Sequence, residues 1–244
     1  MGYAILRVEK IKSAVAGNAR LKHNRRQTDC ITTNPGKTNM CIFFNEQMEK
    51  DRYKNFREIF HERVKDQKIR KNAVYAIEVV QTFSENSVPE EKLEAWIEAN
   101  AKWLCETFGE SNIIDCQGHR DQKVFHLHTL IIPLDDGKLN AHRYLGGSRY
   151  RMMELQDSYS ESMKQFGLSR GISREQTQAR HESTKKWLNR QAEKENRLKA
   201  YEEKYGTEKD WDFDEMLEFR RLIRKEEKEM GSPVFDEKDE EIEK

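Results

Sequence analysis

Short apolar runs alternate with charged amphipathic segments along the first two-thirds of the chain. Five of these runs are rich in β-branched and aromatic residues, which favour strands. The predicted strands cover residues 3–8, 40–44, 73–80, 112–118 and 125–132. Only residues 119–124 separate the last two strands, so we expect these strands to form an antiparallel hairpin.

The clearest helical pattern follows Ser87, a suitable N-cap, and ends at Gly109, a suitable stop. Its apolar residues recur on one face, with Trp96 and Trp103 beside them. Tryptophans at this spacing more often belong to a core than to a ligand platform, and we predict a core role. Further helices are predicted over residues 46–68 and 149–166, and a long charged helix beyond residue 173.

Strands interleaved with helices around one central hairpin predict an α+β fold, with helices packed on an antiparallel sheet. The chain has no internal repeat. We predict a main domain over residues 1–190, a charged helical extension over 191–232, and a disordered acidic tail over 233–244.

The composition suits a domain with a solvated appendage. Charged residues and hydrophobic residues each make up 36% of the chain. No segment reaches the apolar length of a membrane span and the N-terminus lacks a signal sequence, so we expect a cytoplasmic protein. The cysteines show no paired spacing and are read as reduced thiols, neither disulfides nor a zinc site. They are Cys30, Cys41, Cys105 and Cys116.

The net charge of zero hides a gradient along the chain. Residues 1–26 carry seven basic groups against one acid, whereas residues 202–244 carry seventeen acids against nine bases. A basic N-terminal stretch is suited to a phosphate backbone. On charge alone, a merely solvated surface explains both segments equally well.

Three of the seven histidines fall within ten residues, at His119, His126 and His128. Side chains alternate along a strand, so His126 and His128 share a face roughly 7 Å apart while Leu127 faces the opposite way. His119 ends the partner strand and can reach the same face. Three converging imidazoles leave other positions of a metal open, as a catalytic ion requires.

The alternative is an inert pair of hydrogen-bonded histidines on a solvent-facing strand, which the third histidine argues against. Imidazole nitrogens bind Zn, Mn, Fe, Co and Ni alike. A phosphodiester substrate would favour Mn²⁺ or Mg²⁺, because the ion must also take a phosphate oxygen.

A second cluster surrounds His23, between Lys22 and Arg26 in the sequence KHNRR. Neighbouring cations favour neutral, nucleophilic imidazole. Arginine also offers a bidentate fork to phosphate oxygens. By itself, a histidine in such a basic loop indicates at most a phosphate contact.

Several sequence blocks, in order, resemble the MobV family of relaxases, the Pre/Mob plasmid recombination and mobilisation enzymes. The resemblance covers residues 1–190, and its order makes it specific. The blocks are KHNRR, NPGKTN, IRKNAV, FGESNI, HRDQKVFHLH, DDGKLNA and ARHESTKKW.

The resemblance implies a palm-like sheet and metal-dependent nicking and rejoining of DNA at a plasmid transfer origin. His23 would be the nucleophile that keeps the 5′ phosphate, Arg26 its partner, and His119, His126 and His128 the ligands of a divalent metal, Mn²⁺ first. The partner would be single-stranded or hairpin DNA, with a homodimer through the C-terminal helices. The expected DNA contacts are Lys22, Asn24, Arg25, Arg70, Lys71, Arg143, Lys185 and Lys186.

Two positions depart from the family pattern. The family has Glu where this chain has Gln122, and Pro where it has Phe125. Glutamine cannot take a proton at neutral pH, so Asp121 or Glu78 would have to serve as the catalytic acid or base.

Three other functions remain open at this stage. One is a rolling-circle replication initiator or transposase with a tyrosine nucleophile, for which Tyr3, Tyr75, Tyr144 and Tyr150 are candidates. Another is a three-histidine hydrolase of small phosphoesters, which the basic N-terminus argues against. The last is a DNA-binding accessory protein with a degenerate site, which Gln122 keeps open.

Overall fold

The computed structural model describes residues 2–28, 36–65, 67–147 and 149–171, together with isolated positions between 193 and 221. The chain separates into two compact units, Met1–Gly171 and Ile172–Lys244. The predicted extension lies mostly, and the predicted tail wholly, outside the described residues. The predicted domain boundaries therefore stay predictions. No helix of the described residues is long and apolar enough to cross a membrane.

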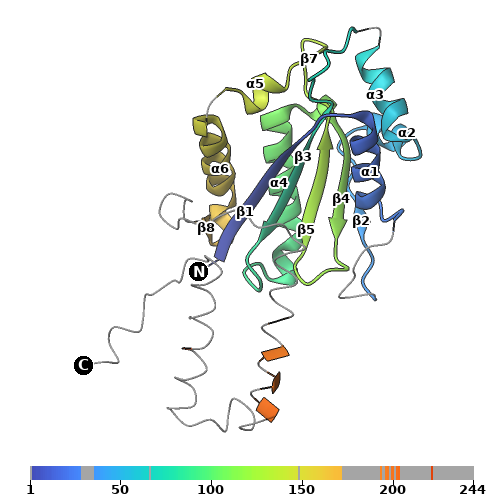
Figure 1. Ribbon diagram of the computed structural model, residues 1–244. Coiled ribbons are helices and arrows are strands. Elements are labelled where there is room, and N and C mark those ends of the chain that lie inside the picture. The colour runs from blue at the N-terminus through green and yellow to red at the C-terminus, as the bar shows by residue number, and fades with distance from the viewer. Residues whose placement is uncertain are drawn as a thin grey trace. The chain divides into compact units, whose positions relative to one another are not determined.

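A six-stranded sheet forms the centre of the first unit (Figure 1). Its strands are β1 (Gly2–Ile11), β2 (Met40–Cys41), β3 (Ala76–Phe83), β4 (Ile113–His119), β5 (His126–Ile131) and β8 (Leu168–Arg170), in the order β2-β4-β5-β3-β1-β8. Every neighbouring pair is antiparallel except β1 with β8. The predicted α+β fold with its central histidine-bearing hairpin is confirmed. A separate short ladder pairs β6 (Leu134–Asp135) with β7 (Lys138–Leu139).

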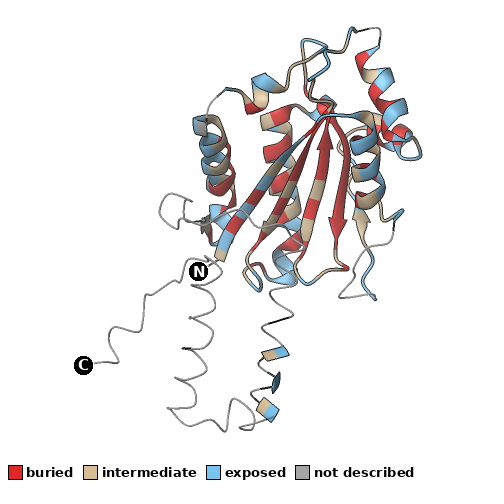
Figure 2. Ribbon diagram, viewed as in Figure 1, coloured by how far each residue is buried: buried red, intermediate tan, exposed pale blue. Residues whose placement is uncertain are grey.

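Helices cover both faces of the sheet (Figure 1). The helices are α1 (Ala14–Asn24), α2 (Glu46–Asp51), α3 (Phe56–Val64), α4 (Leu93–Phe108), α5 (Ala141–Leu145) and α6 (Arg149–Met163), with short 3-10 turns at Glu90–Lys92, Glu110–Asn112 and Lys164–Phe166. One face packs against α4 and α6, and the buried residues Trp96 and Trp103 belong to that core. Their predicted core role is confirmed, and the buried strands run through the middle of the molecule (Figure 2).

The opposite face packs against α1 and α3 through a smaller core. This core lies toward the end of the sheet where β3 begins, and joins Leu21 and Phe56 to Ala76 and Leu130. The part of this face toward the β4–β5 turn carries the histidines. The sheet therefore buries one face fully and keeps half of the other for polar chemistry.

No helix was predicted over the basic stretch between Lys12 and Arg26, and the interpretation of the surroundings of His23 as a loop is wrong. Residues Ala14–Asn24 form α1, whose N-terminus is capped by the Ser13 side chain. The buried Gly17 gives the reason: a Cβ there would lie 2.4 Å from the Phe56 ring, so glycine allows α1 to approach α3. Tertiary packing thus overrides the low helix propensity of glycine and asparagine.

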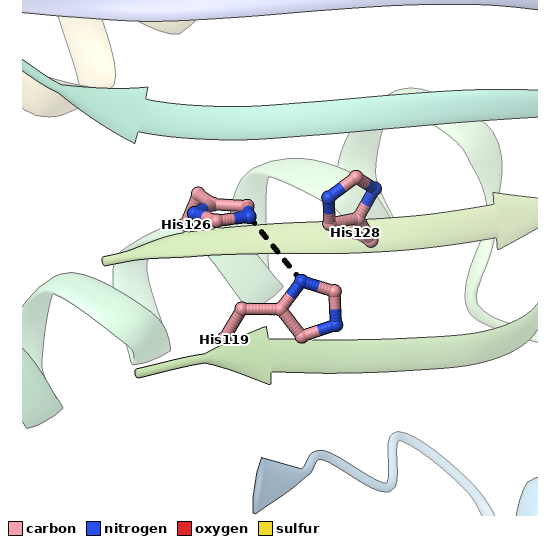
Figure 3. Close-up of side chains that lie close together, drawn as sticks. All are labelled: His119, His126 and His128. Carbon is pink, nitrogen blue, oxygen red and sulfur yellow. Dashed lines mark hydrogen bonds between the residues drawn. The ribbon is translucent and has the colours of Figure 1, made fainter. Parts of the chain in front are cut away.

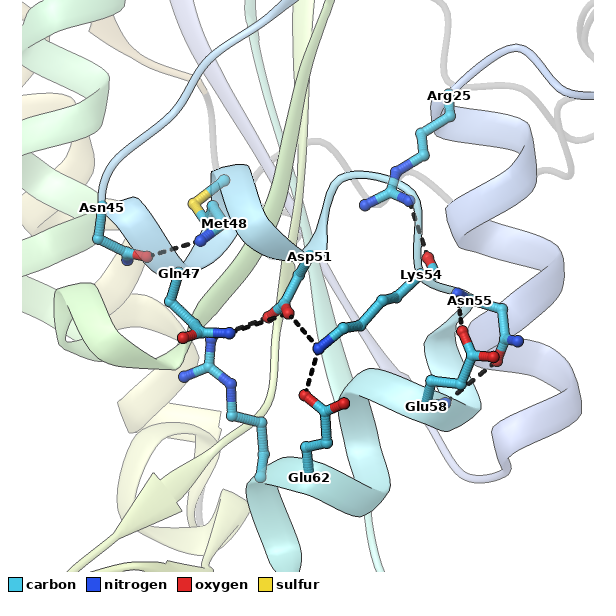
Figure 4. A network of polar contacts seen from close by, with 10 residues as sticks. Arg25, Asn45, Gln47, Met48, Asp51, Lys54, Asn55, Glu58 and Glu62 are labelled. Carbon is cyan, nitrogen blue, oxygen red and sulfur yellow. Dashed lines mark hydrogen bonds and ion pairs between the residues drawn. The ribbon is translucent and has the colours of Figure 1, made fainter.

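The segment predicted to be helical over residues 46–68 contains two helices, α2 and α3, separated by a short loop. Asn55 starts α3 with a capping box, in which its side chain and that of Glu58 exchange hydrogen bonds with the backbone. The fully buried Asp51 ends α2 and pairs with Lys54 at 3.0 Å. Figure 4 shows this network joining α2 to α3.

The strand boundaries shift in smaller ways. The strand expected over residues 40–44 contains only Met40 and Cys41, and the strand expected over 73–80 runs instead from Ala76 to Phe83. The sequence did not predict β8, a three-residue strand at the sheet edge.

Candidate metal centre

Three histidines meet on the half-open face of the sheet. Antiparallel pairing places His119 of β4 directly opposite His126 of β5, and His128 follows two residues later on the same face. The three ring centroids lie 4.7 to 5.0 Å apart. One nitrogen of each ring lies within 4.8 Å of the others. Figure 3 shows the rings converging over the two strands.

Each histidine also has a fixed hydrogen-bond acceptor. His119 Nε2 donates to the Asn24 carbonyl at 2.8 Å, and His126 Nδ1 donates to the Val124 carbonyl at 2.9 Å. His128 Nδ1 lies 3.1 Å from the Glu78 carboxylate. Carbonyl and carboxylate oxygens only accept, so these contacts fix which nitrogen carries the proton. The lone pairs of His119 Nδ1, His126 Nε2 and His128 Nε2 remain for a metal.

The spacing of these nitrogens fits a cation. His119 Nδ1 and His126 Nε2 lie 3.2 Å apart, the contact dashed in Figure 3. Two nitrogens bound at roughly 2.1 Å to one tetrahedral or octahedral ion lie roughly 3.0 to 3.4 Å apart. With their other nitrogens already donating, two neutral rings would point lone pairs at each other, and a cation between them removes that repulsion.

The protonation of the cluster also suits a metal. Burial lowers the pKa of His119 to about 3 and the pKa of His126 to about 4. Neutral imidazole is the form that binds metals. The residues present therefore fit a divalent ion, and they are the one such group of three or more metal-binding side chains among the described residues.

His23 lies beside this cluster, in the last turn of α1. Its ring centroid is 6.0 Å from that of His128 and 6.5 Å from that of His119. Partial burial lowers the pKa of His23, and the positive charge of Arg26 lowers this pKa further. A neutral imidazole thus lies beside the candidate metal centre.

Arg26 and Asp121 form a clamp between α1 and the β4–β5 turn. Arg26 Nε and Nη2 donate to the two Asp121 oxygens at 2.8 and 2.7 Å. Arg26 adopts a left-handed backbone conformation at φ 54°, which directs its side chain after the helix ends. Its buried Nη1 has no partner among the described residues, so both of its N–H groups lack an acceptor.

Glu78 stands behind His128 on β3. It is 2% exposed and also contacts Asn24 Nδ2 at 3.3 Å and Arg20 Nη1 at 3.2 Å. Burial opposes ionisation of Glu78, but the hydrogen bond from His128 Nδ1 and the charge of Arg20 give it a lowered pKa. An ionised Glu78 therefore orients His128.

Gln122 does not join the histidine cluster. It lines a cavity of about 420 Å³ together with Phe125 and Leu93, which belong to the α4 side of the sheet. Phe125, which stands where the family has proline, packs its ring edge-on against Trp96. Of the two residues expected to replace the family glutamate, Asp121 is bound to Arg26 and Glu78 to His128. An acid or base role for either stays a prediction.

The residues expected to contact DNA fall into three groups. Lys22 is exposed near the histidines, whereas Asn24 is 1% exposed and Arg25 is 10% exposed and paired with Asp115. Arg70, Lys71 and Arg143 are exposed, but they flank the opposite end of the sheet from His126. Lys185 and Lys186 lie outside the described residues.

Two residues that the sequence did not single out complete the site. Arg20 pairs with both Glu9 at 2.7 Å and Glu78 at 3.2 Å. The Asn39 side chain accepts hydrogen bonds from the backbone of Arg120 and Asp121 at 2.8 and 3.2 Å, which fixes the segment after β4. Asn39 is the last residue of the block NPGKTN, and its place in that block is the only feature of the sequence that could have indicated a role.

Comparison with known proteins adds a family to this geometry. Residues 1–189 match the family model described as plasmid recombination enzyme (Mob_Pre). The chain is 29% identical to plasmid recombination enzyme type 3 of Staphylococcus aureus, over 75% of this chain and 46% of that protein. It is 32% identical to a 65 kDa protein of Zymomonas mobilis, over 70% of this chain and 30% of that protein. This chain spans half or less of the length of these relatives.

Solved structures share the fold. The relaxase domain of MobM, crystallised with manganese and with oriT DNA of plasmid pMV158, superposes with a TM-score of 0.65 at 24% identity. The match covers 77% of this chain and 98% of that domain. A further structure of that domain, bound to a 23-nucleotide oriT DNA, gives a TM-score of 0.63 at 25% identity over 78% and 98% of the two chains.

Proposed function

The chain belongs to the plasmid recombination enzyme (Mob_Pre) family, and on that premise we propose that it is a DNA relaxase. It would nick one strand at a plasmid transfer origin with a divalent metal, and later rejoin that strand. The observation that carries the proposal is the position of His23, whose ring lies 6.0 Å from one of three histidines that converge on a common centre.

His119, His126 and His128 would hold the metal, and Mn²⁺ is the first candidate because the MobM domain was crystallised with manganese. When bound, the ion would polarise the scissile phosphate. Every other step belongs to the residues of the chain.

The chemical step would begin with a ring nitrogen of His23, which is neutral because its pKa is lowered. This nitrogen attacks phosphorus, an N–P bond forms and the P–O3′ bond breaks. The 3′ oxygen leaves and takes a proton from solvent, while the 5′ phosphate stays on His23. Arg26 would direct its unpartnered Nη1 at the phosphate, and Asp121 would hold the guanidinium in place.

Exposed residues on the same face suit a single DNA strand. Ile5 pairs with Thr82, which pairs with His126, so one row of the sheet leads from β1 to the metal centre. Ile5 is 38% exposed and the neighbouring Tyr3 is 40% exposed. Apolar and aromatic side chains beside cations are typical of surfaces on which bases stack.

A nicking assay on supercoiled plasmid tests the proposal, using plasmids that carry the DNA flanking this gene. We expect relaxation after EDTA treatment only when Mn²⁺ is restored, and none with His126→Ala. A labelled strand should remain bound to denatured protein through an acid-labile N–P bond, and His23→Ala should abolish this adduct.

Tyr3→Phe is the matched control, because Tyr3 is the one of the four tyrosine candidates that lies on the histidine face near this end of the sheet. Loss of the adduct with Tyr3→Phe but not with His23→Ala would replace the proposed nucleophile. Metal-free protein that binds DNA and never cuts it would favour the accessory function.

A further inference from the structure

A cavity of about 230 Å³ lies beside the candidate metal centre, and the proposed chemistry does not use it. It lies between the end of α1, helix α2 and the edge strand β2, on the histidine face of the sheet. Gln117, which lines the cavity, is the direct cross-strand partner of His128. The cavity is therefore one strand away from the place where a phosphate would be cut.

Asp115, which lines the cavity, carries one carboxylate oxygen without a hydrogen-bond donor. Asp115 is 2% exposed, and its Oδ1 accepts from Arg25 Nε at 2.8 Å and from Gln117 Nε2 at 3.1 Å. Its Oδ2 is buried and has no partner among the described residues. A buried oxygen without a donor is costly, so a ligand that supplies a donor would be stabilised here.

The carboxylate is held rigidly. Arg25 Nη1 also donates to the Lys54 carbonyl at 3.0 Å, which anchors the guanidinium between α1 and the loop before α3 (Figure 4). Asp115 is thereby fixed from one side by Arg25 and from the other by Gln117. Such a preorganised acceptor gives specificity rather than mere attraction.

The walls and rim suit a flat ring. Ile114 and Met48 are buried and apolar, while Phe43 is 44% exposed at the rim. Arg52, an exposed cation whose guanidinium lies 4.6 Å from the centre of the Tyr53 ring, also lines the cavity. Phenyl and guanidinium planes both stack on nucleobases, and the cavity volume exceeds that of a single base.

We propose that this cavity, the base pocket, takes one unstacked nucleobase of the bound strand and selects a base with an exocyclic amine, which cytosine, adenine and guanine carry, over thymine, which lacks one. The amine would donate to Asp115 Oδ2, where thymine would present a carbonyl oxygen to a carboxylate. This inference rests on the proposed DNA-cleaving function. It names the residues that determine specificity at one position near the cut.

A binding selection tests the base pocket without any cleavage. The full chain is mixed with single-stranded 20-nucleotide DNA of random sequence in EDTA, and the bound fraction is sequenced. We expect one position to favour the bases with an exocyclic amine over thymine by at least about five-fold. Phe43→Ala and Gln117→Leu should abolish this preference, whereas Tyr150→Ala, an exposed aromatic on α6, should retain it.

Cross-linking of the wild-type protein gives a second readout that does not depend on a variant folding. Cys41 is an exposed free thiol that lines the base pocket. A strand with a disulfide tether on the N4 amine of cytosine at the selected position should cross-link to Cys41, and Cys41→Ser should prevent this.

Two results would overturn the base pocket: a selection without a base preference, or a tether that reacts elsewhere. If Mn²⁺-dependent nicking persists in that case, the proposed function survives and only the base pocket is lost. A clear preference and cross-link in a protein that never nicks DNA would leave the base pocket and remove the proposed catalysis. Failure to bind DNA at all would overturn both.

Discussion

At the scale of single residues, the three acceptors behind the histidines differ in charge. His119 and His126 donate to backbone carbonyls, whereas His128 faces the carboxylate of Glu78. A carboxylate behind a metal-binding imidazole both fixes its tautomer and raises its basicity. Of the three acceptors, Glu78 is therefore the one that a side-chain substitution can change.

Glu78→Gln is expected to weaken Mn²⁺ binding by about 10- to 100-fold, because an amide orients His128 less firmly and lacks the charge. Isothermal titration with Mn²⁺ measures the change. Glu9→Gln is the matched control, since Glu9 pairs with the same Arg20 but touches none of the three histidines. Equal losses in both variants would mean that Arg20, and not the contact with His128, supports the metal centre.

Asp121→Asn is expected to slow nicking by about 100-fold while changing Mn²⁺ affinity little. The substitution removes the charge that holds Arg26 in a bidentate pair, and small displacements of a catalytic group can cost about 100-fold in rate. Single-turnover nicking at saturating Mn²⁺ measures the rate. Asp157→Asn, which breaks a surface pair with Arg170, should leave the rate unchanged. A large loss of metal affinity with Asp121→Asn would contradict the clamp.

The sequence predicted the histidine cluster because strand periodicity and a short hairpin are local properties. It could not predict the partners of those histidines. Glu78 lies 50 residues from His128, and Asn24 lies 95 residues from His119. These contacts exist only because β3 pairs with β5 and α1 crosses β4. Neither arrangement can be predicted from the pattern of a single sequence.

At the scale of elements, the position of α1 decides where His23 stands. Its C-terminal turn carries His23, Asn24 and Arg25, which face the metal cluster, Glu78 and Asp115 respectively. Its middle is held against α3 by the contact of Gly17 with Phe56. A shift of this helix would therefore displace three functional side chains together.

Gly17→Ala is expected to destabilise the protein by about 1 to 3 kcal/mol, because the added methyl overlaps the Phe56 ring. Helix propensity alone predicts the opposite sign, a gain of about 1 kcal/mol. Urea denaturation distinguishes the two. Gly36→Ala is the control, since nothing lies within 4 Å of a Cβ at that position. A stabilised Gly17→Ala protein would show that α1 is less tightly packed than described.

The same contact explains why α1 was missed from the sequence. A glycine, two asparagines and several cations leave a weak apolar stripe, and of the three buried residues of α1, Gly17, Leu21 and Asn24, only Leu21 has a large apolar side chain. Conversely, the helix that ends at Gly109 was predicted because its apolar stripe is strong and its stop signal is local. A helix that is stabilised by tertiary contacts, and not by an apolar stripe of its own, cannot be predicted from the hydrophobic pattern of the sequence.

At the scale of the whole molecule, the sheet separates stability from chemistry. The face under α4 and α6 holds the larger core, whereas the other face holds a small core at one end and the metal centre at the other. The class of fold followed from the order of strands and helices in the sequence. The division of one face between packing and chemistry did not, because it depends on where α1 and α3 come to rest. The homodimer through the C-terminal helices stays a prediction.

Every residue of the candidate metal centre lies in the unit Met1–Gly171, so a chain cut after Gly171 is expected to bind Mn²⁺ as tightly as the full chain. Mn²⁺ at about 100 times its dissociation constant should stabilise both chains by about 2.7 kcal/mol, which urea denaturation measures.

The affinity for DNA, in contrast, should differ between the shortened chain and the full chain. If Lys185 and Lys186 contact phosphates, their loss should lower the dependence of log affinity on log salt by about 1.4, since each contact to single-stranded DNA contributes about 0.7. Lys185→Ala with Lys186→Ala in the full chain should reproduce that decrease. A shortened chain that loses Mn²⁺ binding would show that the second unit supports the metal centre, and an unchanged salt dependence would remove both lysines from the DNA-binding surface.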